Sequence, residues 1–93
     1  MGVLFCLAST ADADQVQFKI LVNGRATYAS FANVQVLNPR NIEQFRGDTD
    51  RYGRIRLDIP PGDYRAVVAV RGTTKTANLK LTGETKLRVV VLN

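Results

Sequence analysis

The sequence predicts an all-β protein, a seven-stranded antiparallel Greek-key β-sandwich. Short segments in which apolar and polar residues alternate recur along the chain, and turn signals such as Asn23-Gly24, Asn38-Pro39 and Gly83-Glu84 separate them. Helix signals are nearly absent. The 93 residues have room for one domain, and 45% apolar with 23% charged residues is typical of a globular protein.

The first half of the chain contains three predicted strands and one ambiguous segment. Residues 15–22 alternate, and the side chains predicted to face the core are Val16, Phe18, Ile20 and Val22. Residues 25–31 are ambiguous because they are rich in small and aromatic residues. Residues 32–37 alternate again, with inward positions at Ala32, Val34 and Val36. Residues 41–46 are predicted to form a short edge strand anchored by Ile42 or Phe45.

Four further strands are predicted in the second half. Residues 53–59 place Ile55, Leu57 and Ile59 on one face, and residues 64–70 do the same with Tyr64, Ala66, Val68 and Val70. Residues 75–81 offer Ala77, Leu79 and Leu81. In residues 86–92 the predicted inward side chains are Leu87, Val89 and Val91. This last strand is a candidate sheet edge, so a homo-oligomer formed by edge-strand pairing is one possible assembly.

The segment Ile59-Pro60-Pro61-Gly62-Asp63-Tyr64 has the spacing of a tyrosine corner. In such a corner the phenol hydroxyl bonds to a backbone group upstream and fixes a crossover between sheets. Pro61 presets its φ angle, and Gly62 can adopt a positive φ without steric cost. We therefore interpret Pro61, Gly62 and Tyr64 as a structural corner rather than as a ligand-binding loop.

The pattern Thr49-Asp50-x-x-Gly53-x-Ile55-x-Leu57-x-Ile59-Pro60-Pro61-Gly62-x-Tyr64 resembles the central signature of carboxypeptidase regulatory-like domains, which are transthyretin-like β-sandwiches within the broader immunoglobulin-like class. The resemblance covers most of residues 16–92, including the Ala-x-Val-x-Val strand at 32–36 and the closing hairpin at 79–87. PEGA-type domains are the nearest rival, and residues 25–31 depart from the family's short linker. The resemblance implies a non-catalytic module that works beside secreted peptidases, receptors or surface proteins.

Residues 1–13 differ in character from the sandwich domain expected over residues 14–93. An apolar run, residues 3–8, is followed by the small-residue patterns Ser9-Thr10-Ala11 and Ala11-Asp12-Ala13, as in the second half of a secretory signal. No Lys or Arg precedes the run, and it is shorter than the roughly 20 apolar residues that cross a bilayer. We favour a truncated signal remnant, and hence a secreted or periplasmic protein, over an N-terminal strand.

The inventory of reactive side chains argues against an enzyme and predicts no cofactor or metal site. The sequence has no histidine and one cysteine, Cys6, so histidine-based triads and the usual zinc sites lack their ligands. Residues 48–53 approach the start of a calcium loop, but Tyr52 replaces a ligand and no glutamate follows at the required distance. A hairpin turn is the favoured interpretation. Asp48 with Asp50 is the remaining carboxylate pair, without a partner base.

The function predicted from these observations is contact with a protein or glycan partner. Residues 25–31 and 38–48 form the predicted contact loops, in which Tyr28, Phe45 and Arg46 are the candidate contact residues, while Phe31 is assigned to the core. The alternative is a basic module for nucleic acid or acidic polysaccharide, because the net charge is +5. Nucleic acid is the less favoured ligand, since the basic side chains expected on the surface form no run and lack an aromatic platform: Arg54, Arg56, Arg65, Lys80, Lys86 and Arg88.

Overall fold

The computed structural model describes residues 14–83 and 86–92, so both interpretations of residues 1–13 fall outside the described part of the chain. All the regular structure in the described residues is β-strand. The eight strands are β1 (Asp14–Val22), β2 (Arg25–Tyr28), β3 (Asn33–Leu37), β4 (Glu43–Asp48), β5 (Arg54–Leu57), β6 (Gly62–Val70), β7 (Thr73–Leu81) and β8 (Leu87–Leu92). The all-β prediction is confirmed.

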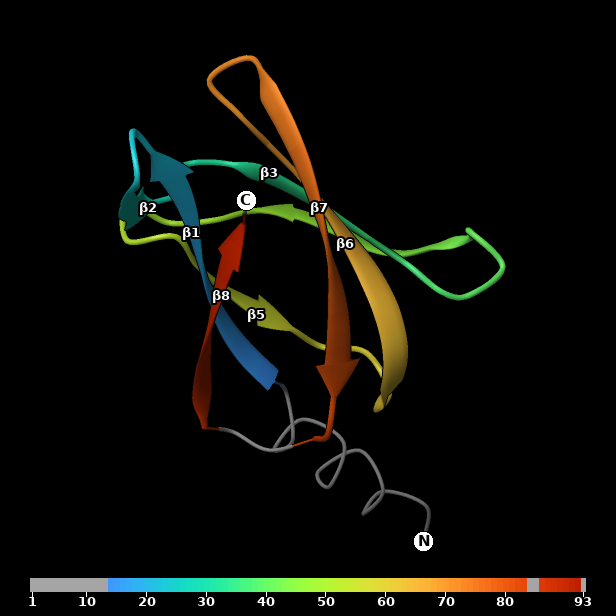
Figure 1. Ribbon diagram of the computed structural model, residues 1–93. Coiled ribbons are helices and arrows are strands. Elements are labelled where there is room, and N and C mark those ends of the chain that lie inside the picture. The colour runs from blue at the N-terminus through green and yellow to red at the C-terminus, as the bar shows by residue number, and fades with distance from the viewer. Residues whose placement is uncertain (1–13, 84–85, 93) are drawn as a thin grey trace, which may run out of the picture.

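The strands form two layers, which we call sheet A and sheet B (Figure 1). In sheet A, β1 is central: β2 pairs with its second half and β5 with its first half. The strand β8 pairs with β1 in parallel, Gln15 opposite Leu87 and Ile20 opposite Leu92. Sheet B has the order β4-β3-β6-β7 and is antiparallel.

Alternation along the strands builds the core between the two layers. Sheet A contributes Val16, Phe18 and Leu57 to this core, and sheet B contributes Val34, Val36, Ala66 and Val68. All seven residues are fully buried. Each buried residue in β1 is followed by one that points outward, because successive side chains of a strand alternate between the two faces. Apolar burial of this kind is the main stabilising contribution to the fold.

Two features of the predicted topology are corrected. Residues 25–28 form an additional strand, β2, because the Asn23-Gly24 turn folds them back onto Lys19–Val22. The antiparallel arrangement has an exception in the described residues, since β8 enters sheet A from β7 in sheet B and runs parallel to β1. The inward position predicted at Val22 is wrong, because Val22 is exposed at the end of β1. Of the two anchors predicted for residues 41–46, Phe45 packs against the core from the edge strand β4, whereas Ile42 is exposed before that strand.

The phase of β8 is opposite to the predicted one. Its inward side chains are Arg88, Val90 and Leu92, which lie opposite the buried β1 residues Val16, Phe18 and Ile20. The side chains predicted for the core, Leu87, Val89 and Val91, point to the outer face of sheet A. The alternation could not determine the phase because residues 89–92 are apolar on both faces of the strand.

The tyrosine corner is present at the crossover from β5 in sheet A to β6 in sheet B. The hydroxyl of Tyr64 donates to the carbonyl of Pro60 at 2.7 Å. Gly62 has a φ of 154°, a region that residues with a side chain rarely adopt. The ring of Tyr64 is half-buried and packs against the core cluster. Pro61, Gly62 and Tyr64 therefore lie at the chain's change of sheet, and the hydrogen bond expected of a tyrosine corner is present.

Within 14–83 and 86–92 there is no helix of the length and apolar character that crossing a bilayer requires.

Candidate functional site

The outer faces of the two sheets differ in chemical character. On sheet A, large apolar and aromatic side chains are exposed from four separate parts of the chain: Leu21, Tyr28, Tyr52, Leu87, Val89 and Val91. We call this set the sheet A face. The outward residues of sheet B are mostly polar or small, among them Asn33, Gln35, Arg46, Ala69, Thr74 and Thr76. Several large apolar side chains exposed on one side of a small domain are characteristic of a contact surface.

The strand β8 contributes the aliphatic part of the sheet A face. Leu87, Val89 and Val91 are 40%, 53% and 45% exposed. They lie opposite Gln15, Gln17 and Lys19 of β1, so apolar and polar rows run side by side across the sheet. β8 pairs with β1 along one side and has no second strand neighbour among the described residues, which makes it an edge strand.

The aromatic part of the sheet A face is an ordered cluster. The rings of Tyr28 and Tyr52 meet edge to face, with centroids 5.7 Å apart and planes at 87°. The guanidinium of Arg54 lies 4.8 Å from the centre of the Tyr52 ring, and the ammonium of Lys19 lies 5.5 Å from that of Tyr28. Such contacts hold aromatic side chains in fixed orientations while one side stays in solvent.

The turn between β2 and β3 carries Phe31, whose backbone amide bonds to the segment just before Tyr52. Its side chain is 72% exposed, and its φ is +52°, which is uncommon for a bulky residue. The assignment of Phe31 to the core is therefore wrong. Ala29 and Ala32 occupy the buried positions of this turn instead, and the backbone of Phe31 donates to the carbonyl of Asp50 at 3.1 Å.

Thr49 holds the Phe31 turn from inside the protein. Its hydroxyl donates to the carbonyl of Ala29 at 2.6 Å and accepts the amide of Ala32 at 2.8 Å, and the residue is 3% exposed. These bonds tie both ends of the turn to the segment that follows β4. A left-handed bulky residue costs about 1–3 kcal/mol, which the surrounding structure has to offset. The Thr49 bonds fix the backbone of the turn from which the exposed Phe31 side chain projects.

The carboxylate of Asp50 organises the adjoining turn before β5. It accepts the amides of Tyr52 and Arg54 at 2.9 Å each and the Arg54 guanidinium at 3.0 Å. The amide of Arg54 is the main reason that the pKa of the Asp50 carboxyl lies below its ordinary value. Gly53 completes the turn with a φ of 74°. These contacts support the hairpin-turn interpretation of residues 48–53.

No group of three His, Cys, Asp or Glu side chains arranged to hold a metal ion occurs among the residues that the structure describes.

The three predicted contact residues do not form one surface. Tyr28 belongs to the sheet A face. Phe45 is half-buried and packs against the core, because its position in β4 points inward next to Val36. Arg46 points to the other side of β4 and forms an ion pair with Glu43 at 2.8 Å. Adjacent residues of a strand cannot share a face, so Phe45 and Arg46 are separated by the alternation itself.

Sequence reasoning missed most of the sheet A face. Leu21 was visible as a break in the alternation of residues 15–22, and the run Val89-Val90-Val91 was visible as a strand that is apolar on both faces. Both signals indicate strands that carry apolar residues on both faces, so some of these residues must lie outside the core between the sheets. Their positions next to Tyr28 and Tyr52 follow from the pairing of β1 with β2 and β8, which connects segments about 70 residues apart.

No protein-family model matches this sequence, and no curated protein sequence is similar to it.

Proposed function

We propose that this protein is a non-catalytic binding module that docks a protein partner onto the sheet A face. The observation that carries the proposal is the contrast between the two outer faces: six large apolar or aromatic side chains are exposed on sheet A, whereas the large apolar side chains at outward positions of sheet B, Leu37 and Val67, are half-buried. Solvent-facing sheets normally carry polar side chains outward. Exposed aromatics with nearby arginines have the composition of an interface centre.

The partner that this face fits is a protein with an apolar surface and acidic residues at its margin. The charged side chains among the aromatic rings are cationic, Lys19 and Arg54, and the nearest carboxylate, Asp50, is already bonded to Arg54. Acidic groups on the partner would complement them. A second copy of this chain fits less well, because a twofold interface centred on this face brings like charges together.

Preorganisation supports the same proposal. The Tyr28–Tyr52 contact orders these two rings, and the Thr49 and Asp50 bonds fix the backbone of the adjoining turns, before any partner arrives. A surface that is already ordered loses less conformational entropy on binding than a flexible loop does.

The finer classification and the location belong to the proposal as well. The Tyr64–Pro60 corner at a sheet crossover supports a transthyretin-like sandwich of the carboxypeptidase regulatory-like type, with Greek-key connections. The apolar run and small-residue patterns of residues 1–13 support a secreted or periplasmic site of action. N-terminal sequencing of the protein after expression in its own cells tests the second point.

The docking experiment compares two photo-cross-linking variants in cells, one with the cross-linking residue at Val89 on the sheet A face and one at Thr76 on the outer side of β7. Both residues are exposed β-branched strand residues. We expect the residue at position 89 to form an adduct with one partner protein. The residue at position 76 should form no adduct with that protein. Equal adducts from both positions, or adducts only with a second copy of this chain, would contradict the proposal.

Calorimetry with the purified partner then measures affinity for Val89→Glu and Thr76→Glu. We expect Val89→Glu to weaken binding by about tenfold or more, as for loss of an interface centre, and Thr76→Glu to leave it within about twofold. Thermal unfolding of both variants serves as the control for folding. Arg46→Gln tests the contact position predicted from sequence, and we expect binding to be unchanged. Equal weakening by the two glutamate variants would place the contact elsewhere.

A further inference from the structure

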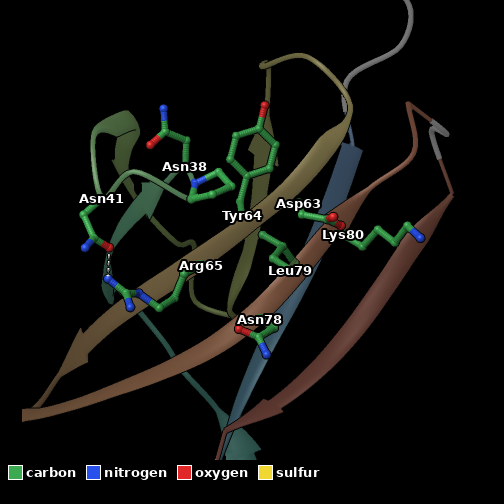
Figure 2. A pocket seen from close by; sticks show the side chains of 9 residues that line it. Asn38, Asn41, Asp63, Tyr64, Arg65, Asn78, Leu79 and Lys80 are labelled. Carbon is green, nitrogen blue, oxygen red and sulfur yellow. Dashed lines mark hydrogen bonds between the residues drawn. The ribbon is translucent and has the colours of Figure 1, made fainter.

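The hollow at one end of sheet B does not gather its polar groups into one site. It has a volume of about 510 Å³ and lies where the β3–β4 loop meets β6 and β7 (Figure 2). Alternation directs Arg65 and Lys80 to the outer face of sheet B, and Tyr64 and Leu79 to the core. Figure 2 shows Arg65 turned toward its hydrogen-bond partner Asn41 and Lys80 pointing the other way. The free side of β8 is the stronger candidate for recognition.

The strand β8 differs from the other edge strands in its lack of protection. Sheets normally guard their edges with short strands, irregular pairing or charged side chains, because an unpaired edge can accept another strand. Here β2 and β5 have four residues each, β4 pairs with β3 through a register shift, and β4 and β7 carry charges. These charged residues are Glu43, Arg46, Asp48, Lys75 and Lys80. The strand β8 pairs without a register shift, and its one charged side chain, Arg88, is neutralised by Asp14 at 2.8 Å. It is therefore the least protected edge in the described part of the chain.

The hydrogen bonds of β1 show which of its backbone groups face β8. The amide of Phe18 donates to Gly53 at 2.8 Å, and the carbonyl of Phe18 accepts from Ala29 at 3.0 Å. Both groups thus point toward β5 and β2 and away from β8. Because backbone groups alternate in direction along a strand, those of Gln17 and Lys19 point toward β8.

Parallel pairing then sets the direction of each β8 residue. Gln17 lies opposite Val89, and in a parallel pair such a residue bonds to the two neighbours of the one it faces, here Arg88 and Val90. The amides and carbonyls of Val89 and Val91 consequently point to the other side, where no strand pairs with β8 among the described residues. The same two residues also carry side chains of the sheet A face, 53% and 45% exposed. They offer apolar side chains to the face and backbone donors and acceptors at the edge.

An extended protein segment fits this edge. Strand addition obtains affinity from main-chain hydrogen bonds and specificity from alternate side chains. A segment next to β8 would place every second side chain beside the aliphatic row Leu87, Val89 and Val91, which favours apolar residues there. The solvent-accessible charged side chains of β1 and β8 are cationic, Lys19 opposite Val91 and Arg88 with its side chain 35% exposed. Acidic residues at the ends of the segment would complement them.

A second copy of this chain is a less suitable occupant. Antiparallel pairing of two β8 strands would place both Arg88 side chains on the same side of the joined sheet, and each copy brings a net charge of +5. A partner segment with acidic ends has neither disadvantage.

We propose that the partner of the sheet A face adds an extended segment to the free side of β8, pairing with the backbones of Val89 and Val91, and that this segment is apolar at every second position and acidic at its ends. The inference rests on the proposed docking function and adds the form of the bound segment to it. Contact with the face and contact with the edge are separable, because the first uses side chains and the second uses main-chain groups.

Amide hydrogen exchange of the free protein, followed by NMR, tests the backbone directions. The amides of Val89 and Val91 should exchange about tenfold or more faster than those of Val90 and Leu92, which bond to β1. Slow exchange at Val89 and Val91 would mean that the edge is already occupied, by the same chain or by a second copy, and would overturn the proposal.

The binding probe is a peptide with the proposed pattern, acetyl-Glu-Val-Thr-Val-Thr-Val-Glu-amide. Titration should shift and protect the amides of Val89 and Val91 but not those along the free side of β7. The same peptide with its three central residues replaced by proline should bind about tenfold more weakly or worse, because proline has no N–H to donate. Lysine in place of both terminal glutamates should also weaken binding. No binding of the probe, equal affinity of the proline or the lysine peptide, or shifts along β7 instead would each contradict strand addition.

An amide-to-ester replacement at Val89 separates the edge from the face, because it keeps the side chain and removes only the N–H group. Thr76 is the matched control position. Val70 and Thr73 close a two-residue turn as a hydrogen-bonded pair, so by alternation the Thr76 amide points to the free side of β7. The ester at Val89 should weaken binding of the peptide by about fivefold or more, and the ester at Thr76 should leave it within about twofold.

The same ester, tested on the protein captured by cross-linking at position 89, distinguishes the two proposals. We expect the ester and Val89→Glu both to weaken its binding. If Val89→Glu weakens binding and the ester does not, the partner uses the sheet A face without the edge, so strand addition is excluded while the docking function stands. If neither change weakens binding, the docking function fails as well.

Discussion

The carboxylate of Asp14, the first described residue, accepts a 2.8 Å hydrogen bond from the guanidinium of Arg88, 74 residues later in the chain. Asp14 is 1% exposed and also accepts the amides of Thr82 and Gly83 at 3.2 and 3.0 Å. One side chain thereby fixes the start of β1, the end of the β7 segment and the inward direction of Arg88. The bond between Asp14 and Arg88 favours the observed phase of β8, in which Arg88 shares a face with Val90 and Leu92.

Asp14→Ala should lower the free energy of unfolding by about 2–4 kcal/mol, because it leaves a partly buried guanidinium and two backbone amides without their acceptor. Asp48→Ala is the matched control: Asp48 is exposed, and its carboxylate makes a 3.4 Å contact with Asn33, so the expected loss is below about 0.5 kcal/mol. Urea unfolding followed by circular dichroism measures both values. Similar losses of unfolding free energy for the two variants would show that the Asp14 carboxylate makes no special contribution to stability.

The observed phase of β8 predicts opposite results for two adjacent valines. Val90 packs against the core cluster, whereas Val89 is 53% exposed. Val90→Thr places a hydroxyl in the apolar interior and should cost about 1–2 kcal/mol of unfolding free energy. Val89→Thr keeps the β-branched shape on the solvent side and should change stability by less than about 0.5 kcal/mol. A larger stability loss for Val89→Thr than for Val90→Thr would instead support the phase predicted from the sequence, in which Val89 faces the core.

Gly53 is required both for its backbone conformation and for the close approach of a neighbouring strand, whereas Gly24 is required only for its backbone conformation. Both have positive φ angles, 74° and 77°. A Cβ on Gly53 would lie 2.3 Å from the Phe18 carbonyl oxygen, whereas a Cβ on Gly24 would meet nothing within 4 Å. Gly24→Ala should therefore cost about 1–2 kcal/mol for its backbone conformation, and Gly53→Ala more than about 3 kcal/mol. Chemical denaturation of the pair separates the backbone penalty from the steric penalty, and equal losses would show that the close approach is unimportant.

The turn at Asp50 makes stability depend on pH. The pKa of the Asp50 carboxyl lies below its ordinary value, mainly because the Arg54 amide donates to it. A carboxyl with a lower pKa in the folded state stabilises the fold above its unfolded pKa, and this stabilisation is lost as the pH falls through the folded pKa, below about pH 4. The melting temperatures of the wild type and Asp50→Asn should therefore differ most at pH 6–7 and converge toward pH 2.

The control for the pH experiment is Asp63→Asn, since the Asp63 carboxylate bonds to no described residue. Its melting temperature should follow that of the wild type across the same range. A constant difference between the wild type and Asp50→Asn at all pH values would mean that the charge of Asp50 does not contribute.

Local patterns were sufficient for most of the architecture. The alternation placed Phe18, Val34 and Val68 in the core, and the Pro-Pro-Gly-x-Tyr spacing located the corner at Tyr64, because each of these signals depends on neighbours within a few residues. The candidate site was predicted only at Tyr28. The same alternation that identifies a strand also shows that Phe45 and Arg46 cannot act together.

The sequence by itself determined which segments are strands, where most of them turn, and that the chain lacks histidine. Only the tertiary structure decided which way β8 faces and which distant residues become neighbours. Apolar residues on both sides of a strand leave its phase undetermined by local pattern, and in the tertiary structure the bond of Arg88 to the buried Asp14 carboxylate and the burial of Leu92 favour one of the two phases. Pairing between distant strands then brought Tyr28, Tyr52 and Val89 onto one face, because surface neighbours are set by the partners of each strand and not by distance along the chain.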